Sequence, residues 1–357
     1  MPVSPSLEPV QKCAERQQRE TELRNWVVAQ LGVDAEQVVA EWQSVVGDAS
    51  CRRYFRFTPP RSRAALLAMD APPDSEDLSS FIAIGKRLNA AGLRAPAILA
   101  SDADHGFALL EDFGDGLLKH QLQAENGECL YQRLLPVLSG LAVDVDCGGL
   151  PDYSQHKLLD ELALFPDWYL AHHTGCVFDA GEQQLWQSFC ELLLASALEQ
   201  PQVFVHRDFH SCNLLALGVG TDDDSFCAGD TGIIDFQDAV RGPLSYDLVS
   251  WLWDRYIAWP RAQQVEWIER FRLHLCANDS AVSQWLAAVD PMQWRRYCDW
   301  MGLQRNLKVV GIFARLHQRD GRDGYVEMIP TFARYVRDVL ACYPELESYR
   351  QLLVPRL

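Results

Sequence analysis

Two polar segments, each preceded by an apolar run typical of a strand, constrain this chain more than any other feature. In the first, Val203–Val205 lead into a loop that carries the carboxylate of Asp208 and, five residues later, the carboxamide of Asn213. In the second, a short apolar run leads to the carboxylate of Asp235. A hairpin return between the two segments would set Asp235 beside Asn213. Such a pair offers oxygen ligands suited to a hard cation such as Mg²⁺.

This arrangement leaves Asp208 available to accept a proton from an incoming hydroxyl group. One base, two metal ligands and no nucleophile are what metal-assisted phosphoryl transfer requires. The structural alternative is that His206 and Asp208 only cap a turn and that Asn213 only begins a strand. We favour the catalytic interpretation because the loop, the returning strand and an upstream turn of small residues occur together.

The upstream turn consists of Gly47, Asp48, Ala49 and Ser50, between two runs of β-prone residues. Small residues allow backbone N–H groups to approach an anion closely, so this turn is a candidate cover for the phosphates of ATP. Alone it would be an ordinary hairpin turn. Arg52 and Arg53 follow directly, and the alternation of a strand should direct one of them towards the phosphates.

The pattern along the chain predicts an α+β fold with a small N-terminal sheet and a larger, mainly helical C-terminal part. Helices are expected at 14–31 and 77–91 and strands within 42–60, 64–70, 97–101 and 106–112, a small antiparallel sheet with one packed helix. Beyond Phe113 and Gly114 the apolar spacing becomes helical. Further helices are expected at 115–123, 127–143, 157–173, 182–199, 261–276, 282–288, 293–318 and 330–342. We therefore predict an ATP-binding domain at 1–113 and a catalytic domain at 114–357.

Composition narrows the possible partners and the compartment. The 357 residues include 32 Lys and Arg against 49 Asp and Glu, a formal net charge of −17, which disfavours binding to nucleic acid or to anionic membranes. The eleven cysteines form no CxxC pair and no zinc spacing, as expected of thiols in a reducing compartment. The polar N-terminus lacks the apolar stretch of a signal peptide. We expect a cytoplasmic monomer.

The run His206-Arg207-Asp208, followed after four residues by Asn213, resembles the H-R-D-x-x-x-x-N catalytic loop of kinases. Asp235-Phe236 followed by Gln resembles a relaxed form of their metal-binding D-F-G triplet. The chain departs from protein kinases in that the strand 64–70 has no lysine and the helix 77–91 has no well-placed glutamate. Either Arg52 or Arg53 supplies the missing charge, or nucleotide binding is altered.

The segments GDAS with RRYFR, MDAPP, HRDFHSCNLL, IIDFQDAVRGPLSYDLVSWLWD and GLQRNLKVVGIFARL extend this resemblance from about residue 40 to the C-terminus. Together they resemble the anomeric N-acetylmuramate/N-acetylglucosamine kinases, within the aminoglycoside phosphotransferase (kinase-like) superfamily. The segment MDAPP in place of a lysine-bearing strand is a feature of that group. The resemblance implies a bilobal protein-kinase-like fold. It also implies phosphorylation of the C1 hydroxyl of the amino sugar with ATP and Mg²⁺, a step of peptidoglycan recycling towards UDP-N-acetylmuramate.

The resemblance also implies roles for individual residues. Asp208 would orient the C1 hydroxyl and accept its proton late in the transfer, while Asn213 and Asp235 would hold Mg²⁺ at the phosphates. Glu111 and Phe113 lie at the expected hinge, where backbone groups would meet adenine. His206 and Asp247 are expected to support the loop, since Asp247 could brace His206 or cap a helix.

Several residues are candidates for contact with the sugar, each with a structural alternative. Arg241 and His210 flank the metal-site motifs and could meet the lactyl carboxylate of N-acetylmuramate, although either could be an ordinary surface or loop residue. Trp168, within the aromatic run 165–169, could stack on a sugar face or belong to the core. Gln237 could donate a hydrogen bond to a sugar hydroxyl or only cap a strand.

Two alternative functions remain open from the sequence. The chain could phosphorylate another alcohol, such as an aminoglycoside, choline, homoserine or another hexosamine, and its acidity suits cationic aminoglycosides. It could also be a nucleotide-binding pseudokinase, because the strand lysine is missing. A protein kinase is disfavoured, because no A-P-E segment or long activation loop follows Asp235.

Overall fold

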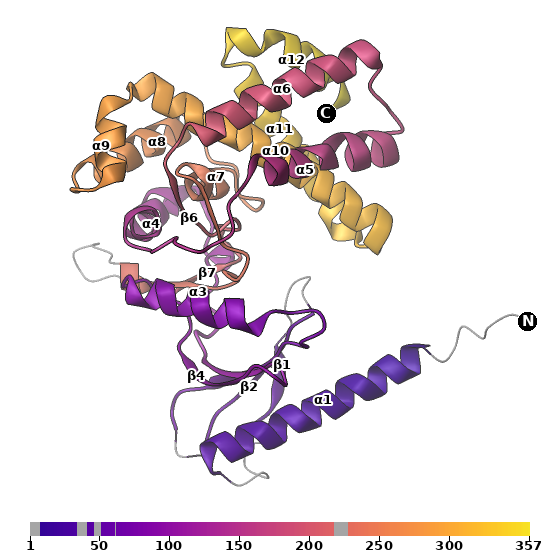
Figure 1. Ribbon diagram of the computed structural model, residues 1–357, viewed down its shortest axis with the longest axis vertical. Coiled ribbons are helices and arrows are strands. Elements are labelled where there is room, and N and C mark those ends of the chain that lie inside the picture. The colour runs from indigo at the N-terminus through magenta and orange to yellow at the C-terminus, as the bar shows by residue number, and fades with distance from the viewer. Residues whose placement is uncertain (1–7, 34–40, 46–50, 61, 218–227) are drawn as a thin grey trace, which may run out of the picture. The chain divides into compact units, whose positions relative to one another are not determined.

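The computed structural model describes residues 8–33, 41–45, 51–60, 62–217 and 228–357, with side chains described from Ala14 onward (Figure 1). The chain forms two compact units. Unit 1 comprises Met1–Asn89, Arg94–Gly116 and Gly232–Gln237, and unit 2 comprises Ala90–Leu93, Leu117–Thr231 and Asp238–Leu357. The mixture of an antiparallel sheet with a mainly helical remainder confirms the predicted α+β class.

Unit 1 is built on a five-stranded antiparallel sheet in the order β1-β2-β3-β5-β4. Its strands are β1 (Gln43–Val45), β2 (Arg53–Phe57), β3 (Leu66–Asp70), β4 (Ile98–Asp102) and β5 (Phe107–Glu111). The helices α1 (Glu8–Leu31) and α3 (Leu78–Ala90) lie on opposite sides of the sheet (Figure 1). All five strands were foreseen in the sequence, because each has a short β-prone run bounded by turn residues.

The helix α1 contributes to the core of unit 1. Its buried Leu23 and Val27 pack with Phe55 and Phe57 of β2 and with residues of β3 and β5. Alternation along the strands places these aromatic rings on one face, which α1 covers. The N-terminal segment, whose sequence pointed to no function, thus completes the sheet's hydrophobic core.

Unit 2 is mainly helical. Its α-helices are α4 (Gly127–Val143), α5 (Gln155–Leu164), α6 (Ala180–Leu198), α7 (Tyr246–Leu252), α8 (Arg261–Cys276), α9 (Ala281–Ala288), α10 (Pro291–Asp320), α11 (Ile329–Leu340) and α12 (Glu347–Leu353). The helix α10 is buried over much of its length and packs against α5, α6, α7, α8 and α11. Short 3₁₀ turns occupy Leu118–His120, Ala124–Asn126, Ala228–Asp230, Asp323–Met328, Pro344–Leu346 and Val354–Arg356.

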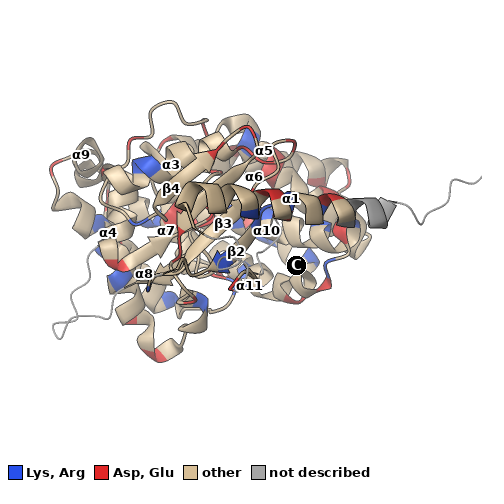
Figure 2. Cartoon of the chain, turned by 90° about the horizontal axis from the view of Figure 1, so that it is seen from below, with Lys and Arg blue, Asp and Glu red and all other residues tan. Residues whose placement is uncertain are grey.

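Two short antiparallel strands, β6 (Gln202–Val205) and β9 (Val240–Pro243), pair within unit 2. The strands β7 (Leu214–Ala216) and β8 (Thr231–Ile233) follow the catalytic-loop motif and precede Asp235, close to where the sequence predicts strands. The chain passes from unit 2 to unit 1 along β8. In the view of Figure 2, the Lys and Arg residues of the described elements are interspersed with Asp and Glu.

The helix predicted at 115–123 is wrong. The structure has only the 3₁₀ turn Leu118–His120 there, because the backbone pairs elsewhere. Leu117 forms a bridge with Leu215, and the amide of Lys119 donates to the carbonyl of Ser211 at 3.0 Å. The predicted helix 157–173 is also modified: α5 ends at Leu164 and a π-helical segment, Phe165–Thr174, continues it.

Candidate active site

The loop between β6 and β7 is held in a strained conformation. Arg207 has a φ of 77°, in the left-handed region that non-glycine residues seldom adopt. The buried carboxylate of Asp247, in the first turn of α7, accepts hydrogen bonds from the amides of His206 (2.7 Å) and Arg207 (3.1 Å). Burial raises the pKa of Asp247 to about 6. This value is still below 7, so the carboxylate is mostly ionised at neutral pH and can accept both hydrogen bonds. Backbone strain in a loop that the surrounding structure holds in place, here through Asp247, is typical of a functional site.

Hydrogen bonds within the loop orient Asp208. Its amide donates to Nδ1 of His206 at 3.3 Å, and its carbonyl accepts from the amide of His210 (2.9 Å) and from Nδ2 of Asn213 (3.0 Å). The carboxamide nitrogen of Asn213 is therefore turned into the loop. The carboxamide oxygen of Asn213 is the atom suited to bind a metal ion.

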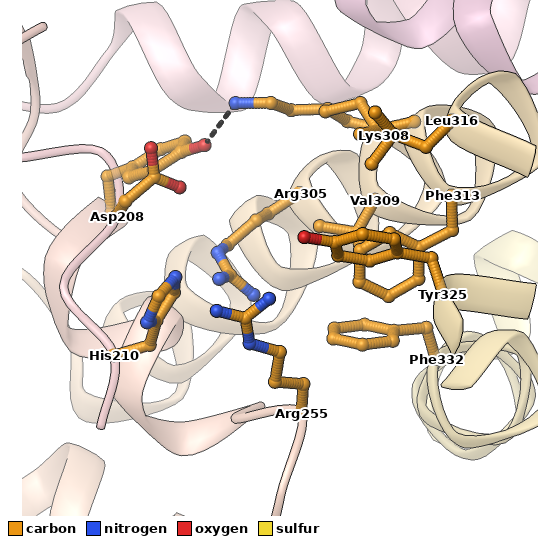
Figure 3. Close-up of a pocket in the computed structure, with 12 residues that line it drawn as sticks. Asp208, His210, Arg255, Arg305, Lys308, Val309, Phe313, Leu316, Tyr325 and Phe332 are labelled. Carbon is orange, nitrogen blue, oxygen red and sulfur yellow. Dashed lines mark hydrogen bonds between the residues drawn. The ribbon is translucent and has the colours of Figure 1, made fainter. Parts of the chain in front are cut away.

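Asp208 lies at a cavity of about 230 Å³ within unit 2 (Figure 3). Three cationic side chains line it with Asp208: Arg305 and Lys308 from α10, and Arg255 from the loop after α7. The remaining lining residues are His210, Tyr246, Val309, Ile312, Phe313, Leu316, Tyr325 and Phe332. The cavity thus combines a candidate base, positive charge and an apolar wall, a combination typical of a site for a small polar substrate.

The sequence analysis did not identify Arg255, Arg305 or Lys308 as site residues. A signal was present for the last two, because they stand three residues apart in a long predicted helix and so share one face. Their burial in α10 required a buried anion or a ligand. Only the packing of α10 against α7 shows that this face meets Asp208.

The ammonium group of Lys308 is fixed in a buried polar network. It lies 3.2 Å from Oε1 of Glu161 and donates to the hydroxyl of Tyr246 at 3.1 Å, the bond drawn in Figure 3. Arg207 binds the same Glu161 oxygen at 2.6 Å, and Tyr153 donates to the other oxygen. One buried carboxylate therefore holds both a loop arginine and a cation of the cavity.

These charges set the protonation states at the cavity. Burial alone would raise the pKa of Asp208, but the positive charges of Lys308 and Arg207 lower it below its ordinary value. Burial and the charge of Arg255 lower the pKa of His210, so its imidazole is neutral at pH 7. Asp208 is therefore ionised and ready to accept a proton, while His210 can donate a hydrogen bond but offers no charge.

Glu161→Ala is expected to lower the free energy of unfolding by about 3–5 kcal/mol, because it leaves two buried cations without their shared partner. Urea denaturation followed by circular dichroism measures the loss. The matched control is Glu347→Ala, which breaks the exposed Glu347–Arg350 pair and should have a much smaller effect. Equal losses for the two variants would show that the Glu161 network contributes no more than a surface ion pair.

Unit 1 carries Asp235 with a second group of charged residues. Asp235 is exposed, has a φ of 62° and accepts a hydrogen bond from Gln237 at 2.8 Å. The next residue, Phe236, is buried and stacks on Phe81 of α3 with ring centroids 4.9 Å apart. A Cβ atom at Gly85 would lie 3.2 Å from the Phe236 ring, so a glycine at this point of α3 allows that close packing.

The two arginines after the small-residue turn have different partners. Arg53 pairs with Asp70 at 2.6 Å and donates to the carbonyl of Arg16, which ties it to β3 and α1. Arg52 pairs with Glu76 at 2.8 Å. Burial raises the pKa of the neighbouring Tyr54, and the charges of Asp235 and Glu76 act in the same direction. Arg52, Glu76 and Asp235 therefore lie around one tyrosine, whereas Arg53 is committed elsewhere.

Other residues proposed from the sequence have defined surroundings. Glu111 pairs with Arg94 at 2.5 Å, and the Arg94 guanidinium lies 5.2 Å from the Phe113 ring centre. Arg241 is exposed and pairs with Asp152 at 2.7 Å, outside the cavity lining. Trp168 contacts His172 in the π-helical segment and is likewise absent from the lining. Gly47, Asp48, Ala49 and Ser50 lie outside the described residues.

The candidate metal ligands belong to different units: Asn213 to unit 2 and Asp235 to unit 1. The described residues contain no cluster of three or more His, Cys, Asp or Glu side chains that could hold a metal ion. The donor set proposed from the sequence, one carboxylate and one carboxamide oxygen, nevertheless fits a hard divalent cation that takes its remaining ligands from phosphate and water.

Comparison with known proteins identifies the family. The sequence profile described as "Phosphotransferase enzyme family" matches residues 41–291. The chain belongs to this phosphotransferase family. It is an enzyme, and membership of a kinase family implies ATP as phosphoryl donor together with a divalent metal ion. The matched region contains Asp208, Asn213 and Asp235.

Curated relatives sharpen the comparison. The N-acetylmuramate/N-acetylglucosamine kinase of Pseudomonas aeruginosa is 38% identical over 319 residues, covering 88% of each chain. The enzyme of the same name from Neisseria meningitidis is 36% identical over 344 residues, covering 94% of this chain and 96% of the relative. The resemblance drawn from the sequence motifs is thereby confirmed.

Solved structures support the fold. The ethanolamine kinase of Plasmodium vivax superposes with a TM-score of 0.60 at 13% identity, covering 88% of this chain and 85% of that one. An ADP-bound aminoglycoside phosphotransferase superposes with a TM-score of 0.53 at 13% identity, covering 88% of this chain and 98% of that one. These likenesses show the kinase-like fold. Within the described part of the chain, no helix offers an apolar stretch long enough for a membrane span.

Proposed function

We propose that this enzyme transfers the γ-phosphoryl group of ATP, with Mg²⁺, to the anomeric C1 hydroxyl of N-acetylmuramate and N-acetylglucosamine. The observation that carries this proposal is the cavity in which the ionised Asp208 faces arginine, lysine and an apolar wall. The names of relatives that match over most of their length supply the substrate class. The sugar 1-phosphate would serve peptidoglycan recycling.

In this mechanism Asp208 orients the sugar hydroxyl and accepts its proton late in the transfer, when the oxygen has become acidic. The hydrogen bonds from His210 and Asn213 to the Asp208 backbone hold the carboxylate in place, so the protein contributes mainly alignment. Asn213 and Asp235 would hold Mg²⁺, which neutralises charge on the phosphates when bound. No nucleophilic side chain is needed.

Arg52 is the better candidate for the charge that protein kinases place on a strand lysine. It pairs with Glu76 within unit 1, and it lies beside Tyr54, the tyrosine on which the charge of Asp235 also acts. Arg53 contributes instead to the packing of α1 on the sheet, through Asp70. Glu111 and Phe113 remain candidates for backbone contacts with the adenine of ATP.

The cavity argues against the cationic alcohols. Aminoglycosides and choline carry positive charge, and Arg255, Arg305 and Lys308 line the space beside Asp208. Like charges in a confined site are unfavourable. The acidity of the whole chain, which made aminoglycosides plausible, does not extend to this cavity. We also propose that the enzyme acts as a cytoplasmic monomer with no nucleic-acid partner, in keeping with its charge of −17.

A coupled assay with ATP and Mg²⁺ against N-acetylmuramate, N-acetylglucosamine, glucosamine and kanamycin tests this proposal. Turnover is expected with the two N-acetyl sugars, and the product should be hydrolysed by mild acid, as a sugar 1-phosphate is. Kanamycin should not react, since its positive charges face the arginines. Turnover of kanamycin alone, or an acid-stable product, would contradict the proposed acceptor.

A further inference from the structure

We propose that Glu161 is a positioning residue for phosphoryl transfer, which fixes the backbone that carries Asp208 to the helix face that lines the acceptor cavity. This inference rests on the proposed function, because it concerns the geometry of the base. Glu161 lies in α5 and is not among the residues that line the cavity, so it acts only through its neighbours. The residues concerned all belong to unit 2.

The first neighbour is Arg207, which directly precedes Asp208. Its φ of 77° is unfavourable for a residue with a side chain, so contacts must hold it there. Its amide donates to Asp247 at 3.1 Å, its carbonyl accepts from Oγ of Ser250 at 3.3 Å, and its guanidinium donates to Oε1 of Glu161 at 2.6 Å. Glu161 therefore anchors the side chain of the strained residue, while Asp247 and Ser250 anchor its backbone.

The second neighbour is Lys308 of α10. Its ammonium group lies 3.2 Å from the same Glu161 oxygen, and its side chain lines the cavity together with Asp208 (Figure 3). Gln304, one turn earlier in α10, donates to the other oxygen of Glu161 at 3.3 Å. Glu161 thus joins the wall of the acceptor cavity to the loop that carries the base.

The carboxylate of Glu161 is enclosed and ionised. Tyr153 donates a hydrogen bond to it, and the Arg207 guanidinium lies 5.4 Å from the centre of the Tyr153 ring. Burial opposes ionisation, but the charges of Lys308 and Arg207 outweigh it and lower the pKa of Glu161 below its ordinary value. Burying such charges is costly, and apolar residues of similar volume are often at least as stabilising. The network is therefore better explained by the geometry that it fixes than by the stability that it adds.

The expected effect on catalysis follows from the place of Arg207 in the loop. When its guanidinium is released, the strained backbone can relax, and the next residue, Asp208, turns away from the acceptor hydroxyl. A displacement of about 1 Å at the reacting groups can lower a rate about 100-fold. The candidate adenine contacts, Glu111 and Phe113, lie in unit 1, so the KM for ATP should change little.

The variant that tests this role is Glu161→Gln, which keeps the shape of the side chain and removes its charge. We expect kcat for the preferred N-acetyl sugar to fall about 100-fold, while the KM for ATP stays within about 3-fold of the wild type. Hydrogen exchange in the peptide 206–213 should become at least about 10-fold faster, because the loop opens more often. The matched control is Glu128→Gln, since Glu128 binds Arg270 and Trp267 away from the cavity. It should lower stability without changing kcat or loop exchange.

A second pair of variants separates positioning from stability. Arg207→Met removes the guanidinium and should also lower kcat. The double variant with Glu161→Gln should regain part of the lost stability, since one unpaired cation is gone, but its kcat should stay close to that of Glu161→Gln alone. Recovery of kcat together with stability, or multiplicative losses of kcat, would overturn the positioning role. If Glu161→Gln fails to fold, Arg207→Met still tests the role, because Lys308 then keeps its partner.

Hydrogen exchange needs no substrate, so it distinguishes this inference from the proposed function. Faster loop exchange in Glu161→Gln, in an enzyme that phosphorylates neither N-acetyl sugar, would support the positioning role and refute the proposed acceptor. Loop exchange equal to that of the wild type in the folded variant would overturn the positioning role, whichever acceptor the enzyme uses. An unchanged kcat in Glu161→Gln would overturn it as well.

Discussion

Asp208→Asn is expected to lower kcat for sugar phosphorylation by about 10²–10⁴-fold, the usual contribution of a general base. The carboxamide keeps the shape of the side chain but cannot accept the hydroxyl proton. The charges of Lys308 and Arg207 keep the native carboxylate ionised, so the whole population of the wild-type enzyme carries the active form at neutral pH. ATP binding should be nearly unaffected, since Asp208 faces the acceptor cavity.

Single-turnover kinetics with the preferred N-acetyl sugar, and ATP binding by calorimetry, measure the two quantities separately. Asp279→Asn, in an exposed turn before α9, is the control for loss of one negative charge. Retained turnover in Asp208→Asn would remove the base from the mechanism. A parallel loss of ATP affinity would instead indicate that the substitution disturbs the loop and not only the proton transfer.

The catalytic loop could be predicted from the sequence because its information is local. The spacing of Asp208 and Asn213, the preceding apolar run and the following strand all lie within a few residues, and hydrogen bonds inside the loop realise that spacing. The sheet of unit 1 was predictable for the same reason. Its strands are short runs with alternating burial, separated by turns.

The cationic residues of the cavity beside Asp208 could not be predicted in this way. Arg305 and Lys308 stand about a hundred residues after Asp208, and their shared helix face does not by itself show what that face contacts. Their role depends on how α10 packs against α7, a tertiary contact that no local pattern encodes. The helix wrongly predicted at 115–123 failed for a related reason, because Lys119 pairs with the catalytic loop rather than with its own turn.

Asp235→Asn is expected to weaken Mg²⁺-dependent ATP binding by about 100-fold, because removing a charged ligand from a partly dehydrated ion costs several times the thermal energy. Asparagine is preferred to alanine in this test, since the φ of 62° at Asp235 is tolerated better by Asn. The packing of Phe236 on Phe81 should then persist. ATP binding without Mg²⁺ should remain as in the wild type.

Titration of ATP into each protein, with Mg²⁺ and with EDTA, gives the metal-dependent part of the affinity. Asp238→Asn, another exposed carboxylate three residues later, is the control. An unchanged Mg²⁺-dependent affinity in Asp235→Asn would exclude Asp235 as a metal ligand.

Because Asn213 belongs to the other unit, a double-mutant cycle with Asn213→Ala tests whether both residues bind one ion. If they share it, the double variant should lose little more affinity than Asp235→Asn alone, since the ion is already lost. Additive losses would mean that the two side chains act on nucleotide binding independently, and the metal site built from this pair would have to be abandoned.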